Sequence, residues 1–171
     1  MPPILIGALR FDFESGWAAS QYDGWQFYRR TFNGIASGTQ AMDVVAVAPG
    51  DACLWLIEVK DYRVHPRENR SGLAEAVAQK TRDTLAGLMA AKVRATVKRE
   101  LRDAQRAVRC RAVRVVFHLE SPSHGEGAEV WRTVRASVQQ KIRVLLQAVD
   151  PHAQVVSMSR MPGLPWSVSP A

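Results

Sequence analysis

Two acidic residues and a lysine lie close together in a segment whose pattern predicts two neighbouring strands. Asp43 opens an apolar run over 44–48, and a second run over 53–57 leads directly into Glu58 and Lys60. Side chains alternate between the two faces of a strand, so Glu58 and Lys60 point the same way. Carboxylates beside a lysine can share a hard cation such as Mg²⁺ and hold a water against a phosphate. The residues therefore predict metal-assisted hydrolysis of a phosphodiester.

A tight turn between the two runs supports their placement on a hairpin. Pro49, Gly50 and Asp51 separate the runs, and these residue types favour a sharp reversal of the chain. Burying an acid and a lysine on one face of a strand is costly, so such charges need a compensating role. The alternative is a solvent-exposed strand end that carries an ion pair between Glu58 and Lys60.

Asp43 and the triplet Glu58-Val59-Lys60 resemble the signature of the PD-(D/E)xK superfamily, the restriction endonuclease-like nucleases. The resemblance implies that Asp43 and Glu58 bind Mg²⁺, for which Mn²⁺ can substitute, and that the backbone carbonyl of Val59 adds a ligand. Lys60 would position or activate the attacking water. Met42 stands at the nominal proline position, where the superfamily varies widely.

The same resemblance implies two auxiliary residues, an acid on the first helix and a glutamine or basic residue on the helix after the lysine. Asp23 or Glu14 is the candidate for the acid, and Gln79, followed by Lys80, is the candidate for the second position. No strict spacing selects them, so Asp23 and Gln79 are secondary candidates.

Positive charge concentrates in one part of the chain. The 171 residues carry a formal net charge of +7. Residues 80–114 hold 11 Lys and Arg against 3 Asp and Glu, a net charge of +8. This excess favours a nucleic-acid partner over a solvated helix face. The candidate nucleic-acid-binding residues are Arg29, Arg30, Lys80, Lys92, Lys98, Arg99 and Arg102.

The sequence motifs of zinc, redox and deaminase sites are absent or incomplete. Cys53 and Cys110 are too far apart in sequence for a short zinc or redox motif, and the four histidines show no ligand spacing. His118-Leu119-Glu120 matches the H-x-E of zinc deaminases, but no Pro-Cys-x-x-Cys follows it. The sequence shows neither a signal peptide nor an apolar run of about 20 residues. We therefore expect a cytoplasmic protein without a membrane partner.

The elements that position these residues are expected to form a single α/β domain over 1–171. Helices are expected at 22–32, 71–109 and 129–149, with a break in the long one between Gly87 and Ala95. We expect a central mixed β-sheet flanked by helices on both faces, compatible with the α-β-β-β-α-β core of the restriction endonuclease-like fold. The tail, about 160–171, is expected to be irregular. Strands are expected at 4–13, 41–48, 53–60, 112–119 and 154–158.

Together these features predict a Mg²⁺-dependent nuclease, with DNA favoured as the substrate by the superfamily's habits. The alternative is a catalytically inactive nucleic-acid-binding module with the same fold, acting as a partner or accessory protein. An unrelated α/β interaction protein is a third hypothesis. No separate target-recognition segment is evident, so specificity would come from loops, a homodimer or a partner protein.

Overall fold

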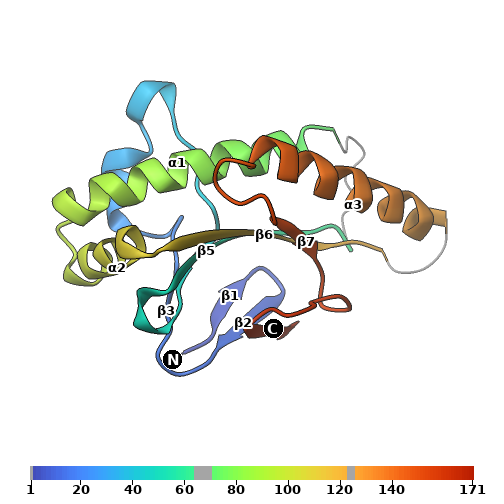
Figure 1. The fold of residues 1–171 in the computed structure, drawn as a ribbon, viewed down its shortest axis with the longest axis horizontal. Coiled ribbons are helices and arrows are strands. Elements are labelled where there is room, and N and C mark those ends of the chain that lie inside the picture. The colour runs from blue at the N-terminus through green and yellow to red at the C-terminus, as the bar shows by residue number, and fades with distance from the viewer. Residues whose placement is uncertain (1, 64–70, 123–125) are drawn as a thin grey trace.

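The structure, a computed structural model, describes residues 2–63, 71–122 and 126–171. A five-stranded sheet with the strand order β3-β4-β5-β6-β7 forms its centre (Figure 1). Helices lie against one face of this sheet, which confirms the expected mixed α/β sheet flanked by helices. The helices are α1 (Leu73–Arg94), α2 (Lys98–Arg109) and α3 (Glu126–Leu145). The strands are β3 (Ala18–Gln21), β4 (Val44–Val47), β5 (Cys53–Asp61), β6 (Ala112–Glu120) and β7 (Gln154–Val156).

The direction of each strand follows from its connection. β3, β4 and β5 form an antiparallel meander, and the predicted hairpin of β4 and β5 is confirmed, with Val44 opposite Ile57. β6 is parallel to β5, and β7 is parallel to β6. Parallel neighbours require a crossover, which α1 and α2 provide for the first pair and α3 for the second.

A second sheet covers the opposite face, where we expected helices. It contains β1 (Ile4–Ile6), β2 (Leu9–Phe13) and β8 (Trp166–Pro170) in the antiparallel order β1-β2-β8. Its apolar side packs on the alternate residues of the central sheet, such as Ile57 and Val116. The central sheet therefore has two cores, one under the helices and one between the sheets.

Two elements of this second sheet differ from the sequence-based expectation. The single strand expected at 4–13 is a hairpin that reverses at Gly7, where φ is +58°. Glycine adopts this conformation without strain, which makes the two-residue turn accessible. The tail expected to be irregular contains β8, because pairing with β2 orders a segment that lacks a strong local pattern.

The helix expected at 22–32 is shorter, because its first aromatic residues precede it. The helical turns include Tyr28–Phe32, and the N–H groups of Gln26 and Phe27 donate to the carboxylate of Glu100, at 2.7 and 3.0 Å. No side-chain hydrogen bond from the residue that precedes Tyr28–Phe32 caps these turns. A carboxylate of α2, distant in sequence, accepts the free N–H groups instead.

The long helical region is broken as expected, but at the edge of the expected window. α1 continues through Gly87 to Arg94, and residues 95–97 separate it from α2. None of the described helices combines the length and apolar character that crossing a membrane requires.

Candidate functional site

Asp43, Glu58 and Lys60 lie on the face of the central sheet that α1 covers. Residues two and four positions from them along β4 and β5, such as Val45 and Leu56, belong to the core under the helices. The backbone N–H of Val59 donates a hydrogen bond to Asp43 Oδ2 at 2.7 Å, which holds the carboxylate against β5. The hairpin therefore places both acids on one side of the sheet, as the proposed site requires.

Glu58 is the centre of the cluster. Its side chain is only 2% exposed, and Lys60 Nζ lies 2.8 Å from its Oε1. Lys80 of α1 approaches the same oxygen, with Nζ at 2.6 Å. Oε2 is buried and has no hydrogen-bond partner among the described residues. One oxygen of this carboxylate thus pairs with two lysines, while the other is free to accept a ligand.

Lys80 was expected at the nucleic-acid surface, and the structure places it inside this cluster. Val77, three residues before it, and Thr84, four residues after it, are both buried. Positions three and four apart share a helix face, so the pattern of α1 carried a signal for an inward-facing Lys80.

Asp23 also joins the cluster, from the turn that follows β3. Burial raises the pKa of its carboxyl, the side chain of Gln21 lowers it, and Asp43 raises it further. Its Oδ1 is buried without a hydrogen-bond partner in the described part of the chain. Asp23 is therefore the secondary candidate that the fold brings near Asp43.

The pKa of Asp43 is raised from 3.8 to about 6. Burial is the main cause, and the neighbouring negative charge of Glu58 adds to it. The Val59 N–H group and the two lysines act in the opposite direction, but they offset only part of the rise. The folded protein thus disfavours the ionised form of Asp43, and pKa shifts of this kind are common at functional sites.

Lys60 shows the opposite balance. Burial works to lower its pKa, but the charge of Glu58 and the hydrogen bond to it raise the pKa more, so that the net shift is upward. Lys60 is therefore a cation at neutral pH. It can donate hydrogen bonds and stabilise negative charge, whereas a role as a general base would require the neutral amine.

The donor set of the cluster fits a hard divalent cation. Asp43 and Glu58 supply carboxylate oxygens, and the free Oε2 of Glu58 is a buried acceptor without a donor. The N–H and C=O of one strand residue point to the same neighbour, so the carbonyl of Val59 faces the Asp43 side as well. No group of three or more His, Cys, Asp or Glu side chains in the described ranges is arranged to bind a metal. Mg²⁺ suits such a site, because it retains several waters beside one or two carboxylates.

The remaining candidates do not contact the cluster. Gln79 is exposed on α1, Glu14 is exposed at the end of β2, and Arg29 and Arg30 are exposed on the short helix. For these four, the described residues show no hydrogen bond or ion pair to either acid of the hairpin.

The basic helix α2 lies at the other end of β5. Arg106 and Arg109 of α2 pair with Asp51, just before β5, whereas Lys60 lies near its far end. Nine residues of extended chain separate Asp51 from Lys60, which corresponds to roughly 30 Å. Figure 1 shows α2 at one end of the sheet and the β5 terminus at the other. The Arg106 and Arg109 end of α2 is therefore remote from the acids, whereas Arg99 Nη2 donates to the carbonyl of Ala19, which pairs with Ala46, three residues from Asp43.

The exposed cations of α2 form a surface of their own. Arg99 lies 3.6 Å from Asp103, and Lys98 and Arg102 are exposed without an ion pair among the described residues. Lys92, near the end of α1, is half-buried. The expected nucleic-acid-binding residues thus divide, because Lys98, Arg99 and Arg102 lie on α2 whereas Lys80 pairs with Glu58.

Comparison with known proteins gives one partial similarity. Over 153 residues the chain is 30% identical to a cysteine–tRNA ligase of Neisseria meningitidis serogroup A / serotype 4A, strain DSM 15465 / Z2491. The match covers 72% of this chain and 22% of the ligase, so the chain spans about a fifth of that relative's length. No family model matches the chain. No solved structure matches it.

Proposed function

We propose that this chain is a Mg²⁺-dependent nuclease of the restriction endonuclease-like type, with DNA as the favoured substrate. The observation that carries the proposal is the arrangement of Asp43, Glu58 and Lys60 on one face of the β4-β5 hairpin, joined by the bond from Val59 N–H to Asp43. The free buried oxygen of Glu58 adds support, because a cation is the partner it lacks.

Each residue has a separate task in this proposal. Asp43 and Glu58 hold the cation, which when bound would supply a polarised water and neutralise charge on the phosphate. Lys60, a cation at neutral pH, orients that water and stabilises the negative charge that develops on the phosphate. Lys80 holds the Glu58 carboxylate in place from α1.

The second candidate function is a nucleic-acid-binding module that does not cleave. The observation that favours it is the pairing of Glu58 Oε1 with two lysines, which can serve as a buried ion network without a metal. In that case the basic end around α2 is the functional surface.

Plasmid nicking in the presence and absence of Mg²⁺ tests the proposal. We expect cleavage by the wild-type chain and a loss of at least about 100-fold in Asp43→Ala and Lys60→Ala, as for groups that act in the transition state. Asp12→Ala, a change of an exposed acid on β2, is the matched control and should cleave normally. Single-stranded DNA and tRNA are tested as substrates alongside the plasmid. The tRNA is included because the name of the similar ligase refers to tRNA.

Binding of the metal has its own readout. Mg²⁺ should raise the unfolding temperature of the wild type, because binding to the folded state adds to its stability. At a Mg²⁺ concentration of 100 times the dissociation constant, the free energy of unfolding should rise by about 2.7 kcal/mol. Mg²⁺ should not raise the unfolding temperature of Asp43→Ala. Cleavage that survives both Asp43→Ala and Lys60→Ala refutes the proposed site. Salt-sensitive binding of nucleic acid, with no cleavage and no stabilisation by Mg²⁺, establishes the binding module instead.

A further inference from the structure

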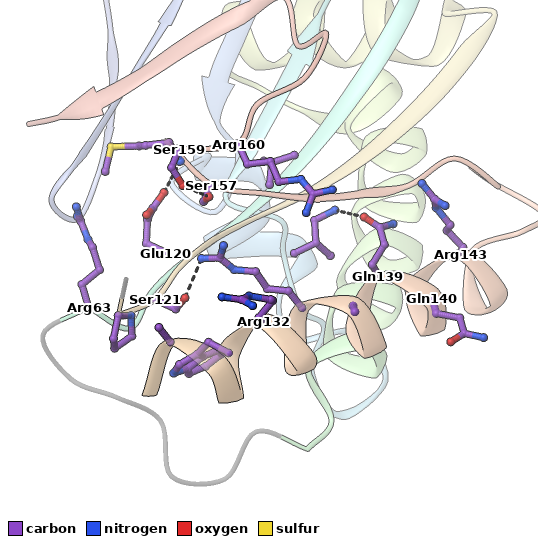
Figure 2. A pocket seen from close by; sticks show the side chains of 18 of the residues that line it. Arg63, Glu120, Ser121, Arg132, Gln139, Gln140, Arg143, Ser157, Ser159 and Arg160 are labelled. Carbon is purple, nitrogen blue, oxygen red and sulfur yellow. Dashed lines mark hydrogen bonds between the residues drawn. The ribbon is translucent and has the colours of Figure 1, made fainter. Parts of the chain in front are cut away.

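A cavity of about 920 Å³ lies between α3, the end of β6 and the segment after β7 (Figure 2). It is distinct from the acid cluster, because none of Asp43, Glu58 and Lys60 lines it. It is nevertheless at the same end of the sheet, since its lining residue Glu120 is the β6 neighbour of Asp61, which follows Lys60. Its volume falls within the range of sites that hold small organic ligands.

The lining of this cavity is strongly cationic. It contains five arginines and one carboxylate, that of Glu120. The Glu120 carboxylate is already engaged, because its Oε1 accepts from Met158 N–H at 2.6 Å and lies 2.8 Å from His118 Nε2. A single acid in these bonds does not offset the charge of the arginines, which are Arg63, Arg132, Arg135, Arg143 and Arg160.

Two of the five arginines have carboxylate partners of their own. Arg63 pairs with Asp61 at 2.6 Å, and Arg132 pairs with Glu129 at 3.1 Å. The other three have no carboxylate at ion-pair distance in the part of the chain that the structure describes. They come from two sides of the cavity, with Arg135 and Arg143 on α3 and Arg160 after β7, and Figure 2 shows Arg143 and Arg160 at the cavity.

Arg135 is the most constrained of these cations. Its Nη2 donates to the carbonyl of Leu119 at 3.1 Å and to Ser121 Oγ at 2.8 Å, while its buried Nε has no described partner. Burial lowers its pKa, Glu120 raises it, and the nearby charge of Arg160 lowers it again. Two cations that disfavour each other in a concave site gain most from an anion placed between them.

The chemistry of the lining selects the ligand. Guanidinium groups match phosphate oxygens in pairs, and a phosphate carries more charge than a carboxylate. The cavity also has an apolar part, which includes Val155, Val156 and Met158, and polar amides at Gln139 and Gln140. An ordinary anion leaves this part unused, whereas a nucleotide has both a phosphate and a flat apolar base.

We propose that this cavity binds the phosphate of a nucleotide-sized ligand, either a free nucleotide or the 5′-phosphorylated end of a nucleic-acid strand. The two sources present the same phosphomonoester to the arginines. The site does not depend on the metal cluster, so it stands whether or not the chain cleaves nucleic acid.

Calorimetric titration of the full chain at low salt tests this site. The probes are AMP, adenosine, and a tetranucleotide with a 5′-phosphate or with a 5′-hydroxyl. Arg143→Gln/Arg160→Gln removes two cations and leaves the contacts of Arg135 in place, although it also removes the bond from Arg143 Nε to the Ala153 carbonyl. We expect binding of a phosphorylated probe to weaken about 100-fold, tenfold for each charge-assisted contact. Arg10→Gln, which removes the charge of one exposed arginine on β2, is the control and should bind as the wild type.

The outcomes separate the sources and the two proposals. Binding of AMP and not adenosine identifies a free-nucleotide site. Binding of the 5′-phosphorylated tetranucleotide alone identifies a strand end. Glu58→Gln should leave either affinity unchanged, even if it abolishes cleavage. The proposal is overturned if no phosphorylated probe binds, or if the double variant and the wild type bind it equally.

Discussion

Replacing Asp43 with asparagine should stabilise the fold at neutral and alkaline pH, even though the residue stands at the centre of the candidate site. The carboxyl has a pKa of about 6 in the folded protein, against an ordinary value of 3.8. Above pH 6 the folded state must hold a charge that burial and Glu58 both disfavour. Asparagine removes that charge and keeps an oxygen that can accept the hydrogen bond from Val59.

The magnitude follows from the shift. A rise of roughly two pKa units corresponds to about 3 kcal/mol at pH 8, of which an asparagine recovers between about 1 and 3, because burying its amide also has a cost. The native state takes up the proton of Asp43 before the unfolded chain does, so the wild type gains stability as pH falls from 6 towards 3.8. At pH 4.5 only about 1 kcal/mol of the penalty remains for the substitution to remove.

Urea denaturation at pH 8 and pH 4.5 measures this effect. With a typical urea dependence of about 2 kcal/mol per molar, the midpoint of Asp43→Asn should rise by roughly 0.5–1.5 M at pH 8, and by much less at pH 4.5. Asp12→Asn is the control, because its carboxyl is exposed and Arg10 lowers its pKa, so its loss should stabilise at neither pH. A destabilised Asp43→Asn at pH 8, or an equal gain at both pH values, refutes this account of the cluster.

Two further substitutions test how the helices are held against the sheet. Glu100→Gln should lower the free energy of unfolding by about 1–3 kcal/mol, because the bonds from the N–H groups of Gln26 and Phe27 lose their charged acceptor. Chemical denaturation measures this loss. An unchanged midpoint contradicts the capping role of Glu100. Gly87→Ala should destabilise by about 1–2 kcal/mol, since the new methyl would lie 2.1 Å from the buried Tyr22 hydroxyl and this outweighs the gain in helix propensity. Tyr22→Phe should rescue Gly87→Ala in a thermal double-mutant cycle, and a strictly additive cycle would show that the hydroxyl is not the obstacle.

Local patterns predicted the hairpin and its chemistry. The apolar runs on either side of Pro49-Gly50-Asp51 define β4 and β5, and the two-residue alternation of a strand places Glu58 and Lys60 on one face. These are short-range properties, because each depends on residues within about ten positions. The secondary candidate Asp23 could be suggested from type alone, but its approach to Asp43 depends on the path of the chain after β3.

Long-range contacts decided the rest. Glu100 accepts from Gln26 and Phe27 across more than 70 residues, and no periodic pattern predicts such a pair. The strand β8 forms because β2 offers it a hydrogen-bonding edge, although its own sequence indicates a loop. Charge density along the chain also proved to be a poor guide to charge in space, since Arg106 and Arg109 of α2 follow the acidic motif in sequence and pair with Asp51 at the far end of β5.

The sequence by itself determined the β4-β5 hairpin and the shared face of Glu58 and Lys60 on β5, whereas the chemistry of the acid–lysine motif stays a prediction. Only the tertiary structure decided which cations accompany those acids. It brought Lys80 to Glu58 and placed Arg106 of α2 at the far end of β5, and it gathered the arginines of α3 and of the segment after β7 around one cavity. The physical reason is that side-chain alternation is set by local backbone geometry, whereas the approach of charges from separate elements is set by how those elements pack.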